Sequence, residues 1–312
     1  MPLLMDVIRP FWRSLVKRPS ALLKDRVEQV RYRSFFDSLC TQRDANQAIL
    51  NALHGGHPFA VARIGHTEGR IVGEWQFKNS RYGRLTLKEA HQYSGIFPVE
   101  RELLDRFAKI YANAIANIDL LGFWQTAFQV RIINALPKSP CMAPLSALEP
   151  YLWIEPWSAA LRGKRVLVVH PFAATIQRQY KENRGLLFED PSVLPAFDLI
   201  TLAPPQTLAP ATAGFYDWQS AYEHLLSEVR ELDFDCALIG CGGYGLPLAA
   251  SVKDMGKQAI HLGGALQLLF GIRGRRWDAD PQFARFFNAS WVRASDLETP
   301  RAAKAVDGGC YW

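Results

Sequence analysis

The chain has 312 residues, 49% of them hydrophobic and 21% charged, and a formal net charge of +6 at pH 7. This composition predicts a globular protein of one large or two closely packed α/β units, and it excludes a disordered or collagen-like chain. The five cysteines form no Cys-x-x-Cys pair, which argues against a disulfide framework and a structural zinc site. No apolar run reaches the roughly 18 residues of a membrane span, and no signal peptide is evident, so we expect a cytoplasmic protein.

Basic residues are spread along the chain, with a modest excess at the start. Residues 1–18 combine apolar residues at helical spacing with several Lys and Arg side chains: Leu4, Ile8, Phe11, Trp12 and Leu15 with Arg9, Arg13, Lys17 and Arg18. A basic amphipathic helix binds anionic lipid, so this segment predicts peripheral contact with the inner face of the membrane. The alternative is a helix that packs its apolar side on its own domain. No nucleic-acid-binding signature occurs, and we expect no nucleic acid partner.

The first half of the chain predicts a helical N-terminal segment over residues 1–54, including a helix over 29–53. A short apolar strand follows and ends at Gly65, and residues 70–77 continue as a helix or a strand. Thr86 is the expected N-cap of a helix over 87–93. A long helix over 99–117 and a short strand over 118–122 come next.

The second half alternates apolar strands with helices, which is typical of a mostly parallel sheet covered on both faces. Strands are expected over 165–170, 198–202, 235–239 and 258–262, and helices over 174–184, 218–231 and 246–255, the second capped by Asp217. We therefore expect an α/β fold with a Rossmann-like catalytic domain over 55–277 and an N-terminal helical extension. The proline-rich residues 137–156 form its predicted crossover, and residues 278–312 a tail packed on the domain.

Directly behind the first strand, Gly65 is followed by His66 and Glu68, with Arg63 on the strand side. One intervening residue lets both side chains point the same way if the segment is extended, so His66 and Glu68 could share one divalent cation. The alternative is that Glu68 caps the following helix and His66 is a surface residue.

A second motif is the glycine loop between a strand and a helix, whose glycines are Gly240, Gly242, Gly243 and Gly245. This context suits backbone amides that bind a phosphate at a helix N-terminus. The acidic residue that a dinucleotide site needs about 20 residues later is missing, which argues against NAD. Tight strand–helix packing explains the glycines equally well.

Three histidines follow strands: His66, His170 and His261. In a parallel sheet all three lie at the edge where ligands bind, although each alone is more simply a loop residue. Arg273, Arg275 and Arg276 stand beside glycines and suit forked contacts with phosphate, the alternative being a solvated turn.

The motif Arg63-Ile-Gly-His-Thr-Glu-Gly69, together with the glycine loop and residues 257–263, resembles the GT-D-type glycosyltransferases. The resemblance implies a Rossmann-like sheet, a nucleotide-sugar donor and a divalent metal, Mn or Mg, held by an Asp-x-Glu motif. Arg63, Gly65 and Glu68 match the family pattern, whereas His66 stands at the position of the family's Asp. Residues 263–274 and the Gly-Gly-Cys-Tyr-Trp end resemble uncharacterised bacterial members linked to surface polysaccharide synthesis.

These observations favour a glycosyltransferase that moves a sugar from a nucleotide-diphosphate donor to a surface glycan or lipid-linked acceptor. Glu68, His66 and Arg63 are the expected catalytic residues. The expected donor-binding residues are Gly65, the four glycines of the loop, His170, His261 and the three arginines. Glu149 and Glu155 are candidates for the acceptor base. A SAM-dependent methyltransferase and a catalytically inactive nucleotide-sugar-binding module are the alternatives.

Overall fold

The computed structural model describes residue 35 and residues 37–312, apart from 125, 127, 209–210, 301 and 304–305. The expected amphipathic helix over residues 1–18 lies outside the described residues, and membrane contact through it stays a prediction. None of the helices in the described part of the chain has the length and apolar character that crossing a bilayer requires.

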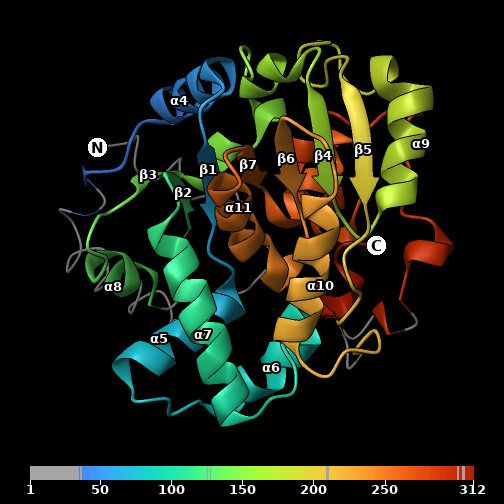
Figure 1. The fold of residues 1–312 in the computed structure, drawn as a ribbon. Coiled ribbons are helices and arrows are strands. Elements are labelled where there is room, and N and C mark those ends of the chain that lie inside the picture. The colour runs from blue at the N-terminus through green and yellow to red at the C-terminus, as the bar shows by residue number, and fades with distance from the viewer. Residues whose placement is uncertain are drawn as a thin grey trace.

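A single sheet of seven strands, all parallel, organises the described residues (Figure 1). Its strand order is β3-β2-β1-β7-β6-β4-β5. The strands are β1 (Phe59–Arg63), β2 (Leu120–Phe123), β3 (Cys141–Pro144), β4 (Arg165–Val169), β5 (Asp198–Leu202), β6 (Cys236–Ile239) and β7 (Gln258–His261). The predicted α/β class and parallel sheet are confirmed. β3 was not predicted, because its four residues lie within the proline-rich segment and end at Pro144.

Helices cover both faces of the sheet, as expected. Alternate residues of β1 show the division, since Ala60 and Ala62 belong to one hydrophobic core and Val61 to the other. The first core contains α5 (His66–Phe77), α6 (Arg84–Ser94), α7 (Arg101–Ala116), α10 (Trp218–Arg230) and α11 (Gly245–Asp254). The second contains α4 (Gln42–Gly55), α9 (Ala173–Asn183) and α12 (Leu266–Leu269), with α13 (Arg275–Asp278) and α14 (Pro281–Ala284) from the C-terminal region. The short helix α8 (Gln129–Asn134) follows β2.

Several helix boundaries differ from the prediction for local reasons. The helix expected over 29–53 is interrupted, because α4 begins at Gln42 behind its N-cap Thr41 and residues 39–40 are not helical. Thr86 is not an N-cap: α6 begins at Arg84, and the Thr86 hydroxyl donates instead to Glu74, 2.7 Å away. Asp217 caps α10 as predicted, accepting a hydrogen bond from the Ser220 amide at 2.7 Å.

The strand order brings the carboxyl ends of β2, β1, β7 and β6 side by side. The chain leaves β6 toward β7 on one side and leaves β4 toward β5 on the other, which makes the β6–β4 boundary a topological switch point. In open parallel sheets ligands bind outside the carboxyl ends of the strands near such a point. The sequence motifs that follow these strands therefore meet at one edge of the sheet, called here the carboxyl edge.

Candidate functional site

Arg63 is the central charged residue of the carboxyl edge. It is the last residue of β1, and its guanidinium lies 4.6 Å from the ring centroid of Trp124, which follows β2. Within the described residues, no hydrogen bond or ion pair joins the Arg63 side chain to the protein. Burial lowers its pKa, with Tyr311, Arg276, Glu149 and Glu68 as the neighbouring charged or polar groups. A partly buried guanidinium with no protein acceptor is suited to receive an anionic ligand.

His66 and Glu68 leave the first turn of α5 in different directions. The helix begins at His66 with Gly65 as its N-cap, so the segment is not extended, and helical residues two apart do not face each other. His66 is exposed and faces the Trp124 ring, with centroids 6.2 Å apart. Glu68 is only 6% exposed and hydrogen-bonds to Ser94.

These residues do not fit a shared divalent cation. The expectation that the two side chains point the same way assumed an extended strand end, and the early start of α5 contradicts it. Within the described part of the chain, no three His, Cys, Asp or Glu side chains gather closely enough to hold a metal ion. No chemical step is therefore assigned to a metal.

Three glycines of the loop after β6 are closely packed against neighbouring residues, and the fourth has open space around its Cβ position. A Cβ on Gly240 would lie 2.6 Å from the His170 ring, and one on Gly245 would lie 2.1 Å from the His261 ring. A Cβ on Gly243 would lie 2.8 Å from a backbone oxygen of the neighbouring helix α6. Gly242 has φ +56° and open space around its Cβ position. Close packing explains three of the glycines, which leaves Gly242 as the position where backbone meets open space.

His170 and His261 lie at the carboxyl ends of β4 and β7, but both side chains are buried. They are 3% and 4% exposed, and burial lowers the pKa of each ring to about 3, so both are neutral at physiological pH. His170 Nδ1 accepts a hydrogen bond from the Phe172 amide at 3.0 Å. His261 Nδ1 lies 3.2 Å from the Ile239 carbonyl, which can only accept, so this nitrogen carries the proton. In this structure both rings support the glycine loop from beneath.

Of the three arginines after β7, Arg276 is the one beside Arg63. Arg276 Nη1 donates to the Tyr311 hydroxyl at 3.1 Å, and its guanidinium lies 4.7 Å from the Tyr311 ring. Arg273 turns to Asp278, 3.2 Å away, and Arg275 is exposed on α13. Two guanidinium groups thus flank one region of the carboxyl edge.

Glu149 joins this region from the segment after β3. It is 6% exposed, and burial raises its pKa to about 7, an effect opposed by the charge of Arg63 and a hydrogen bond with Tyr151. A carboxyl group with a pKa near neutrality is suited to take up and release a proton. Glu155, the other candidate base, is exposed and has no described contact with Arg63.

The C-terminal residues cover part of the carboxyl edge. The Tyr311 ring packs against Gly264, just after β7, so closely that a Cβ on this glycine would lie 2.2 Å from the ring. Glu298 accepts hydrogen bonds from the backbone amides of Ala174 and Thr175 at 2.8 and 3.2 Å, at the N-terminus of α9. The sequence analysis missed Trp124, Ser94 and Tyr311 as site residues. Trp124 directly follows β2, whereas the strand predicted for this part of the chain ends at residue 122.

Comparison with known proteins gives two solved structures of similar fold. One is described as the selenomethionine substituted structure of domain of unknown function 1792; it is 16% identical, covers 73% of this chain and 78% of that chain, and gives a TM-score of 0.44. The other is described as showing that this highly conserved domain has a distinct glycosyltransferase fold, with 17% identity, 72% and 78% coverage, and a TM-score of 0.42. No protein-family model matches the chain, and no curated protein does. At this level of similarity, the function of the chain is argued from its own residues.

Proposed function

We propose that the protein is a glycosyltransferase that uses a nucleoside diphosphate sugar as donor. The observation that carries the proposal is the Arg63 guanidinium, which lies at the carboxyl edge beside Arg276 without a protein acceptor of its own among the described residues. The diphosphate of such a donor supplies the oxygen acceptors that the Arg63 guanidinium lacks among the described residues.

In the proposed reaction, the bond between the anomeric carbon and the diphosphate oxygen breaks while an acceptor hydroxyl oxygen bonds to that carbon. Arg63 and Arg276 would stabilise the negative charge that grows on the departing diphosphate. Glu149 would accept the proton of the acceptor hydroxyl, for which a pKa of about 7 is well matched. Glu68 would position α5 and the glycine loop, since its Oε1 lies 3.6 Å from the Cβ position of Gly243.

The donor's phosphates would approach the loop at Gly242, the position whose surroundings are open. The amides that begin α11 would then face the phosphates, as helix N-termini do in other phosphate sites. Only some of the other predicted donor-binding residues lie close to Arg63. Gly65 and Arg276 lie near Arg63, while Arg273 and Arg275 point elsewhere.

The two alternatives make different demands on the same residues. A methyltransferase binds a sulfonium cofactor that carries positive charge, which the two guanidinium groups disfavour. A non-catalytic binding module would use Arg63 but would not need a carboxyl group with a pKa near neutrality.

Calorimetric titration with nucleoside diphosphate sugars and with S-adenosylmethionine separates these functions. Binding of a nucleoside diphosphate sugar, together with release of the nucleoside diphosphate on addition of an acceptor, is the expected result. Binding without release in any acceptor mixture favours the binding module. Binding of S-adenosylmethionine alone overturns the proposal.

The acceptor is proposed to be a surface glycan or a lipid-linked glycan. Residues 1–18 support a lipid-linked acceptor, because basic side chains near an anionic surface contribute about 1 kcal/mol each. Co-sedimentation of the full chain and of a variant lacking residues 1–18 with anionic and neutral liposomes tests this. We expect salt-sensitive binding of the full chain to anionic liposomes, and equal recovery of both proteins in the supernatant would contradict it.

A further inference from the structure

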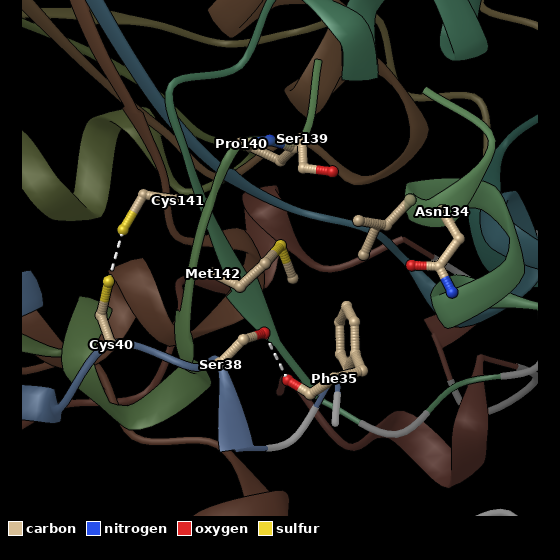
Figure 2. A pocket seen from close by; sticks show the side chains of 9 residues that line it. Phe35, Ser38, Cys40, Asn134, Ser139, Pro140, Cys141 and Met142 are labelled. Atoms are coloured by element: carbon tan, nitrogen blue, oxygen red, sulfur yellow. Dashed lines mark hydrogen bonds between the residues drawn. The ribbon is translucent and has the colours of Figure 1, made fainter. Parts of the chain in front are cut away.

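A pair of thiols lies at the outer edge of the sheet, far from the site described above. Figure 2 shows Cys40 and Cys141 pointing at each other beside a cavity of about 330 Å³. Their sulfur atoms lie 2.6 Å apart, although both cysteines are free. Cys141 is exposed and Cys40 is half-buried.

The backbone holds the two residues in register. The Cys40 amide donates a hydrogen bond to the Met142 carbonyl at 2.8 Å, so the segment before α4 runs along the outer edge of β3. The Cys141 amide donates to the Asp119 carbonyl at 2.8 Å on the inner side. These backbone hydrogen bonds hold the two sulfur atoms 2.6 Å apart, close to the disulfide bond length of about 2.05 Å.

The other three thiols are less accessible to solvent than this pair. Cys236, Cys241 and Cys310 are 0%, 4% and 8% exposed. The cavity beside Cys40 and Cys141 is lined by polar residues, among them Ser38, Asn134 and Ser139, and by the apolar residues Phe35, Ile133, Pro140 and Met142. A small reagent can therefore reach the pair without unfolding the protein, and it can reach the other thiols far less readily.

We propose that Cys40 and Cys141 form a redox-modification site, which is oxidised to a disulfide by exchange with a low-molecular-weight disulfide. One protein thiolate attacks the small disulfide, forming a mixed disulfide and releasing one small thiol. The second protein thiolate displaces the other small thiol and completes the Cys40–Cys141 bond. The small disulfide is thus reduced to two thiols while the two cysteines are oxidised.

The electrostatic setting predicts how the exchange rate depends on pH. Burial, and then the hydrogen bond with Cys40, raise the pKa of the Cys141 thiol to about 12. The Cys141 thiol is therefore protonated near neutral pH, and its reaction with the small disulfide accelerates as the pH rises because the thiolate is the attacking species.

The test is incubation of the full chain with oxidised glutathione, followed by alkylation of free thiols in denaturant and mass spectrometry of peptides. We expect a peptide pair linked through Cys40 and Cys141, and a melting temperature roughly 5 °C above that of the reduced protein, since the bond closes a long loop. Cys40→Ser should retain one glutathione on Cys141, and Cys236→Ala should form the same link as the wild type. Two free thiols, or separate glutathione adducts on both cysteines, would overturn the proposal.

Discussion

Replacing Arg63 with Met should separate ligand binding from stability, because the guanidinium has a function but no protein acceptor. The two effects of this substitution on the free energy of unfolding nearly cancel. The cation–π contact with Trp124, at 4.6 Å, is worth about 0.5–2 kcal/mol and is lost. Removing a desolvated charge recovers a similar amount, since an apolar side chain of like volume is often neutral or stabilising. We expect the free energy of unfolding to change by less than about 1 kcal/mol.

The binding terms do not cancel. Hydrogen bonds to a charged group contribute about 1.5–3 kcal/mol each, so two bonds to a diphosphate are worth about 3–6 kcal/mol. Arg63→Met should therefore weaken nucleoside diphosphate binding by about 10²- to 10⁴-fold. Calorimetric titration measures the affinity, and urea unfolding at the same pH measures the stability.

Arg70 provides the matched control on the neighbouring helix α5. Its side chain, 9% exposed, forms an ion pair with Glu89. Arg70→Met leaves Glu89 without its partner and should cost about 3 kcal/mol of stability, while the diphosphate affinity of the folded protein is unchanged. The reasoning is refuted if Arg63→Met loses more than about 2 kcal/mol of stability and binds as tightly as the wild type, because Arg63 would then be a structural residue.

Three further predictions concern Glu149, the glycine loop and the metal. The pKa of Glu149 is about 7 in the folded protein, above its usual value, so the free energy of unfolding should fall by about 3 kcal/mol between about pH 4.5 and pH 7. Glu149→Gln should remove this pH dependence from a urea-unfolding series. The same variant should abolish the rise of the transfer rate toward pH 7. Gly242→Val should weaken donor binding strongly, and its φ of +56° should cost only about 1–2 kcal/mol of stability. Gly243→Ala should mainly lower the melting temperature, because its Cβ would lie 2.8 Å from the Ser94 carbonyl oxygen. EDTA should leave the calorimetric affinity for a nucleoside diphosphate unchanged, and a loss that Mn restores would show that His66 and Glu68 hold a cation after all.

The fold was largely predictable because its strands are short apolar runs bounded by glycine, proline or charged residues. The predicted strand over 198–202 matches β5 in full, and the run after Lys164 is β4. β3 was not predicted because its proline-rich sequence has low strand propensity, and its pairing with β2 is a contact between residues distant in the sequence. The Thr86 cap was wrong because a buried carboxylate, Glu74, competes for the same hydroxyl.

The site was less predictable, since its chemistry depends on where helices start. The metal hypothesis depended on an extended conformation for residues 66–68. These residues are helical, and helical residues two apart do not face each other. The pattern of histidines after strands was recognised correctly, but burial could not be read from it, and His170 and His261 are inside. Glu149 was named only for its position near the crossover, and its proximity to the charge of Arg63 depends on strand order.

The place of β7 has a consequence for how the chain folds during synthesis. β7 is the last strand of the sheet to be made and lies at its centre, where Ala259 pairs with Ala60 on one side and with Ala237 on the other. Until it emerges, β3-β2-β1 and β6-β4-β5 are separate three-stranded sheets, each with an unpaired inner edge. Such edges attract other strands, and contacts between distant parts of a chain form slowly. A nascent chain therefore carries the unpaired edge of β1 through most of its translation and that of β6 until β7 emerges, and one halted before Gln258 would be prone to aggregation and dependent on chaperones.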